Sequence, residues 1–129
     1  MDAIKKINTY GWADWSINTF NIDYEKILIK ISYYVEMEQH IIIHCNNFIG
    51  FSFVGHWDEN IIEDISIEPK GELIDKSLKE IIRCNGKAPM LGGGIKKLDD
   101  KWYQLNIKMI DGVMIKVACE SIEMDIKAE

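Results

Sequence analysis

After residue 15, apolar and polar positions alternate along most of the chain, and this period of two is typical of strands with one buried face. Polar segments interrupt the alternation at 21–24, 36–39 and 55–60, where turns are expected. The pattern predicts about seven to eight strands, over 15–20, 27–33, 41–45, 48–54, 61–68, 103–109, 113–119 and 122–126.

One strand pair is separated by two residues that favour a tight turn. Asn tolerates a positive φ angle better than other non-glycine residues, so Asn46-Asn47 predicts a two-residue hairpin loop. Pairing across this loop would place Ile42 opposite Phe51.

A second hairpin is predicted with a three-residue loop at 110–112. This loop pairs Ile107 with Ile115 and so keeps the apolar faces of both strands together, which a two-residue loop would not do. It also requires Gly112 in the left-handed region, as in a type I turn followed by a bulge.

The alternation changes phase near the end of the chain. The alternating apolar residues occupy odd-numbered positions up to Cys119 and even-numbered positions from Ile122 onward. One extra residue would cause this change, so a β-bulge is predicted near Glu120-Ser121.

Between the two groups of strands, the apolar period becomes that of a helix. An amphipathic helix is predicted over about 75–85, and Asn85-Gly86 is a natural end for it. Asp75 competes for the N-cap with Ser77, which has Glu80 at capping-box distance. Its apolar stripe consists of Ile74, Leu78, Ile81 and Ile82. A first turn of helix is also expected at 2–7.

These elements predict a mainly β (α+β) fold in a single domain over 1–129. One helix cannot supply the crossovers of a parallel sheet, so the strands should be antiparallel. The expected architecture is a curled sheet, a partly closed barrel or a sandwich, with the helix over one face or end.

Composition narrows the classes of function. The net charge is -6 and the pI is about 5.1, and no basic stripe is present, which disfavours nucleic-acid binding. The amino-terminal residues lack the apolar core of a signal peptide, and no apolar run is long enough to span a bilayer. Three scattered cysteines form no CxxC pair, so we expect a cytoplasmic protein with reduced thiols and no cofactor.

The densest group of chemically versatile side chains lies in the segment Gly55-His56-Trp57-Asp58-Glu59. An imidazole beside two carboxylates suits a binding or acid–base site, although an ordinary turn has the same composition. Gly92-Gly93-Gly94 lacks the context of a phosphate loop and is interpreted as an adaptable loop that covers a pocket or contacts a partner. These residues, His56, Trp57, Asp58, Glu59, Gly92, Gly93 and Gly94, are the candidate binding site.

Other candidates have simpler interpretations. His40 and His44 share a strand face about 13 Å apart at the standard rise, which is too far for one metal ion, so no metal site is predicted. The four tryptophans can line a cavity or a partner surface, but packing in and around the core is the favoured interpretation.

Two segments carry a resemblance. They are Gly-Trp-Ala-Asp-Trp at 11–15, and Phe-Ser-Phe-Val-Gly-His-Trp-Asp-Glu at 51–59 followed by Ile-Ile-Glu-Asp-Ile. Together they resemble small uncharacterised bacterial β proteins, including immunity proteins of contact-dependent toxin systems. The resemblance implies a protein that binds one partner and has no enzymatic activity.

Three functional hypotheses follow. The leading one is a protein-binding module, for which the acidic net charge favours a basic partner. The alternative is a small-molecule-binding protein or hydrolytic enzyme with a β cavity and the Gly-rich loop as a lid. A homodimer formed through an exposed sheet edge is the third.

Overall fold

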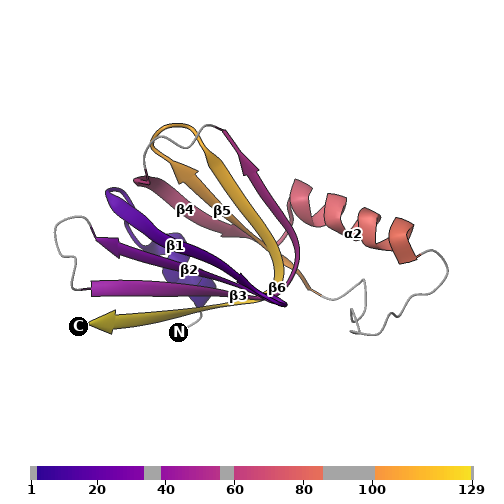
Figure 1. Ribbon diagram of the computed structural model, residues 1–129, viewed down its shortest axis with the longest axis horizontal. Coiled ribbons are helices and arrows are strands. Elements are labelled where there is room, and N and C mark those ends of the chain that lie inside the picture. Colours follow the sequence, from indigo (N-terminus) through magenta and orange to yellow (C-terminus); the bar gives the residue numbers. More distant parts are fainter. Residues whose placement is uncertain (1–2, 34–38, 56–59, 86–100, 129) are drawn as a thin grey trace.

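The computed structural model describes residues 3–33, 39–55, 60–85 and 101–128, which form a six-stranded antiparallel sheet and two helices (Figure 1). The strand order in the sheet is β1-β2-β3-β6-β5-β4. The prediction of a mainly antiparallel sheet is therefore confirmed. The elements are α1 (Ala3–Thr9), β1 (Trp15–Asp23), β2 (Lys26–Tyr33), β3 (Gln39–Val54), β4 (Ile62–Glu68), α2 (Glu72–Asn85), β5 (Tyr103–Met109) and β6 (Met114–Ala128).

The hairpin predicted at Asn46-Asn47 is wrong, because β3 continues through these residues as one strand. Ile42 lies opposite Asp125 of β6 rather than opposite Phe51. Asn47 does adopt a positive φ of 54°, but this conformation bends the strand instead of reversing it. β6 is long enough to pair with β3 on both sides of the bend, so the backbone groups of β3 that face β6 find partners without a turn.

The two predicted strands at 113–119 and 122–126 are likewise one strand, β6. The change of phase is present, because Cys119 and Ile122 are both buried. The bulge expected at Glu120-Ser121 is not the cause, since Asn46↔Ser121 and Phe48↔Cys119 keep one register. Between the pairs Cys45↔Ile122 and Phe48↔Cys119, the side chains of both strands switch the face of the sheet on which they lie. The register shift comes next along β3, between Phe48 and Gly50. Merging these two pairs of segments reduces the predicted seven to eight strands to six.

The turn expected at 21–24 is displaced as well. β1 continues to Asp23, which pairs with Lys26, so only Tyr24 and Glu25 connect the two strands. The side chains of residues 21–23 at the end of β1 are exposed, and two of the three are polar, but their backbone still pairs with β2. Polarity of side chains therefore did not mark the end of backbone pairing.

The common bend of β3 and β6 divides the sheet into two halves that face each other (Figure 1). Ile43 and Cys45 from one half lie in the same core cluster as Leu105 and Val117 from the other. Strands that change face at a bend are a known way for one sheet to cover both sides of a core. The edges β1 and β4 meet at an isolated bridge, Ser16↔Ile61, and backbone amides of Asp14 and Ile17 donate to the carbonyls of Ile62 and Asn60 beside it. No longer ladder closes the sheet among the described residues.

The hairpin of β5 and β6 has the predicted three-residue loop. Ile107 pairs with Ile115, and the amide of Met109 donates to the carbonyl of Val113 at 2.9 Å. Gly112 has φ of 95°, a backbone conformation that L side chains rarely adopt. This prediction is confirmed in both register and loop.

Both helices are longer than expected. The turn predicted at 2–7 is the helix α1, and α2 begins at Glu72, before both predicted N-caps. The cap comes from β5: the Gln104 side-chain oxygen accepts hydrogen bonds from the amides of Leu73 at 2.9 Å and Ile74 at 3.4 Å. These amides lack partners within the helix, so a residue distant in sequence determines where α2 starts.

Candidate functional site

The predicted binding residues, His56 to Glu59 and Gly92 to Gly94, lie outside the described residues. Of the predicted turn at 55–60, Gly55 and Asn60 are described, and both are exposed. The amide of Asn60 donates to the carbonyl of Ile17 at 3.0 Å and ties the end of this turn to β1. The candidate site proposed from the sequence therefore stays a prediction.

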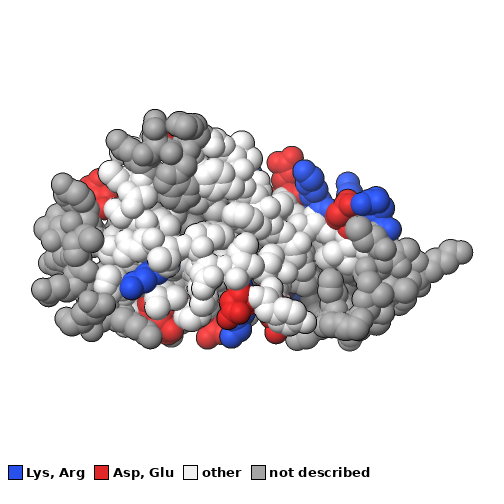
Figure 2. All heavy atoms as spheres, viewed as in Figure 1, with Lys and Arg blue, Asp and Glu red and all other residues white. Residues whose placement is uncertain are grey.

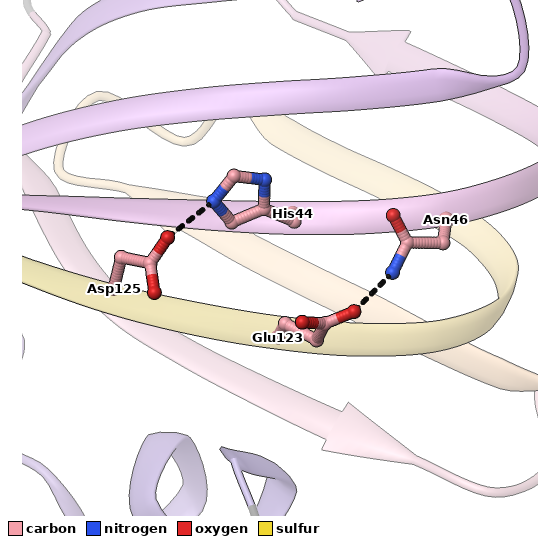
Figure 3. A network of polar contacts seen from close by, with 4 residues as sticks. All are labelled: His44, Asn46, Glu123 and Asp125. Atoms are coloured by element: carbon pink, nitrogen blue, oxygen red, sulfur yellow. Dashed lines mark hydrogen bonds and ion pairs between the residues drawn. The ribbon is translucent and has the colours of Figure 1, made fainter.

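His44 belongs to a polar network on the outer face of the sheet, just before the bend (Figure 3). Its Nε2 lies 2.9 Å from Oδ2 of Asp125, and the side chains are 26% and 57% exposed. The amide of Asn46 donates to Glu123 at 2.9 Å and to the hydroxyl of Ser121 at 3.2 Å.

In a catalytic triad, an aspartate is hydrogen-bonded to one ring nitrogen of a histidine, and a hydroxyl is hydrogen-bonded to the other ring nitrogen. His44 and Asp125 match the first of these two contacts. In this network the Ser121 hydroxyl instead accepts a hydrogen bond from Asn46. The contacts join β3 to β6 across the outer face, as cross-strand pairs do in other sheets. They stabilise the sheet where it approaches its bend.

Two of the three cysteines meet in the core. Cys45 and Cys119 are both fully buried. The hydrogen bond with the Cys119 thiol, together with burial, raises the pKa of Cys45 well above its ordinary value. A thiol with a raised pKa is a poor nucleophile at neutral pH, so Cys45 contributes to the packing of the core.

Three tryptophans are core residues. Trp12, Trp15 and Trp102 are at most 6% exposed, which confirms the packing interpretation for these three. The indole nitrogen of Trp12 donates to the carbonyl of Ile7 at 2.8 Å, and its ring contacts that of Trp15 in an edge-on arrangement. Trp57 lies outside the described residues.

One concave feature among the described residues is a groove between α2 and β3, with a volume of about 480 Å³. Its lining comes from four consecutive residues of β3, from one side of α2 and from one residue of β6. Consecutive strand residues point to opposite faces, so a groove that touches all four also touches the strand backbone. The lining residues are Ile49, Gly50, Phe51, Ser52, Glu72, Leu73, Lys76, Ser77, Glu80 and Lys116.

Gly50 allows α2 to approach β3 closely. A Cβ atom at this position would lie 2.0 Å from the Ser77 hydroxyl oxygen and 3.2 Å from the Ser77 Cβ. Ile74 of the helix packs against Ala118 of β6 on the same outer face. The glycine and this small apolar cluster hold the helix beside the β3 strand (Figure 1).

The carboxyl-terminal half of β3 exposes apolar side chains. Phe51 is 39% exposed and Val54 is 64% exposed. The Phe51 ring lies 4.9 Å from that of Phe20 on β1, centroid to centroid. Charged side chains gather on α2, while much of the neighbouring surface is uncharged (Figure 2). Exposed aromatic residues on an uncharged surface are typical of interfaces.

Sequence reasoning missed this groove because it divided β3 into a hairpin. The chain has no Asp, Glu, Lys or Arg from Gln39 to Trp57, although its net charge is -6. An uncharged run of this kind across a supposed surface turn is the signal that could have indicated one continuous strand. The groove also needs α2 from a later part of the chain, and that contact is not visible in the pattern.

Within the described residues, no helix is long and apolar enough to cross a membrane. Comparisons with known protein families, with curated proteins and with solved structures find no match to this chain.

Proposed function

We propose that the protein is a non-enzymatic binding module that holds a protein partner in the groove between α2 and β3. Its resemblance to immunity proteins of contact-dependent toxin systems leads to the same proposal. The observation that carries it is the groove of about 480 Å³, in which an uncharged stretch of β3 lies beside α2.

The packing of the interior favours binding over the alternative of a cavity enzyme. Side chains from both halves of the sheet meet there, and Ile29, Ile43, Leu105 and Ile107 are each fully buried. Apolar side chains therefore occupy the space between the two halves. A ligand-binding β barrel would instead need an open interior with converging polar groups.

The net charge of -6 affects the rate at which a partner associates. Summed over the molecule, this charge attracts a basic protein at long range and raises its association rate at low salt. We therefore expect a partner that is basic overall, with an association rate that falls as salt is added.

The test is co-purification from the native host with two matched variants. Ser52→Glu places a charge in the groove, next to Lys116, which also lines it. Ile126→Glu places a charge near the carboxyl-terminal end of β6, where Ile126 is 49% exposed. Wild type and Ile126→Glu should retain one protein partner, and Ser52→Glu should lose it while its circular dichroism spectrum stays unchanged. Recovery of a bound small molecule and no protein partner, seen by native mass spectrometry, would overturn the proposal in favour of the alternative.

A further inference from the structure

The carboxyl-terminal half of β3 offers an open edge along the groove. Pairing of β2 with β3 ends at Lys26↔Asn46, and residues 50–52 pair only with β6 among the described strands. The last backbone contact from the first hairpin is the bond from the Phe48 amide to the carbonyl of Glu25, at 3.2 Å. Beyond it, the strand presents outward-facing amide and carbonyl groups that another strand can pair with.

Two lysines on the walls of the groove are available to pair with a carboxylate. Lys76 of α2 and Lys116 of β6 both line it, and neither has an ion-pair partner among the described residues. The lining also holds Glu72 and Glu80, and Glu80 is paired with Arg83. The two lysines without an ion-pair partner favour an occupant that carries a carboxylate, although the chain as a whole is acidic.

We propose that the partner adds an extended segment to residues 49–52 as a further strand, with an Asp or Glu of that segment beside Lys76 and Lys116. This inference rests on the proposed binding function and specifies how the groove is filled. Main-chain hydrogen bonds to β3 supply affinity that is independent of sequence, and the carboxylate supplies specificity. An extended strand that lies between a sheet edge and a helix buries its free backbone groups on one side and its side chains on the other.

A second copy of the chain is a poorer occupant of the same edge. Its own β3 would have to enter the groove, and the sequence from Gln39 to Trp57 contains no carboxylate. Pairing two such edges would leave Lys76 and Lys116 of both copies unmatched. The charge on the groove walls therefore favours a different chain.

The experiment begins with a library of random peptides of about eight residues, long enough to exceed the four-residue edge at the standard strand rise. The library is displayed on phage and selected against the immobilised full-length protein. Selected peptides are then synthesised for binding measurements by calorimetry. Enrichment of Asp or Glu at one fixed position, with β-branched residues around it, is the expected result.

Two variants test the role of charge. Lys76→Glu combined with Lys116→Glu should weaken peptide binding by about tenfold or more, because it replaces attraction by repulsion at the carboxylate. The matched control is Lys5→Glu with Lys6→Glu on α1, a helix that contacts β4 and β6. The control should change affinity by less than about twofold, since exposed charges distant from a site are largely screened.

Hydrogen exchange of backbone amides tests strand addition itself. Adding a selected peptide should slow exchange within residues 49–52, and the groove variant should lose this protection. The inference is overturned if no peptides are enriched, if the enriched peptides lack a carboxylate, or if protection appears elsewhere. It is also overturned if the peptide-free protein dimerises and protects the same amides, because a second copy then occupies the edge.

The proposed function can fail separately. A host partner that binds wild type and the doubly charge-reversed groove variant equally would refute the strand-addition mechanism and leave the binding function intact. Absence of any host partner, with acidic peptides still bound along β3, would count against the proposed function alone.

Discussion

The two halves of β3 belong to one strand and have similar uncharged sequences, yet they differ in burial. In the first half, Ile41, Ile43 and Cys45 are fully buried, whereas in the second half Phe51 is 39% exposed and Phe53 is 40% exposed. The first half has β2 on one side and β6 on the other. The second half pairs with β6 alone among the described strands. The number of neighbouring strands, rather than the residues themselves, decides which half is core and which is surface.

This difference also separates stability from binding. A strand with two neighbours in the core contributes mainly to folding, because its apolar side chains leave water completely. A strand with one neighbour keeps backbone groups and aromatic rings available to another molecule. The four predictions below test this division, beginning with the largest expected effect.

The largest effect is expected for Ile43→Ala in the buried half. Truncating a fully buried isoleucine should lower the free energy of unfolding by about 3 kcal/mol, through lost burial and the cavity left behind. Phe51→Ala in the exposed half should cost only about 1 kcal/mol, because much of that ring already contacts water. Urea denaturation measures both, and equal losses would show that the two halves are not distinct.

A smaller loss is expected where α2 contacts the exposed half. Gly50→Val introduces atoms into the space of Ser77 and Leu73, and should cost about 2 kcal/mol through overpacking. Gly50→Ala should cost less, and combining it with Ser77→Ala should recover most of that loss because the clashing hydroxyl is removed. If the double variant is no more stable than Gly50→Ala, the close contact does not position the helix.

The next effect concerns the start of α2. Gln104→Ala removes the acceptor for the amides of Leu73 and Ile74 and should cost about 1 kcal/mol, as loss of a helix cap does. Hydrogen exchange should accelerate at these two amides in particular. Asn106→Ala is the control, because Asn106 contacts Gln104 without capping the helix. Acceleration of the same size in the control would contradict the cap.

The smallest effect is a dependence on pH at the end of the buried half. The pKa of Cys45 is raised in the folded protein, so its contribution to stability is complete below the ordinary thiol pKa of about 8.5. As pH rises above that value, the unfolded chain loses its proton first, and the free energy of unfolding falls. Urea denaturation between about pH 7 and 10 should show a shallower decline for Cys45→Ala than for wild type. An unchanged slope would exclude this thiol as its source.

Much of the fold could be predicted from alternation alone. The β5–β6 hairpin was predicted to the residue, because each strand has a strict apolar face and Gly112 fits the one loop length that keeps both faces together. The amphipathic helix was also predicted, although its start was placed too late. These features depend on residues close together in the sequence, where local geometry restricts the choices.

The errors fall at the bend and at the groove. Asn46-Asn47 is a plausible turn by its own chemistry, and only the pairing with β6, far along the chain, lets β3 continue through it as one strand. Gln104 in the same way supplies a cap that the residues around α2 do not reveal. The groove combines β3, α2 and β6, so no single segment of the sequence indicates it.

The sequence by itself determined which face of a regularly alternating strand turns toward the core, because burying apolar surface is favourable. Only the tertiary structure decided where the sheet bends, which edge stays open and where α2 lies against it. Those choices depend on hydrogen bonds and contacts between segments distant along the chain, and local patterns carry no record of such partners.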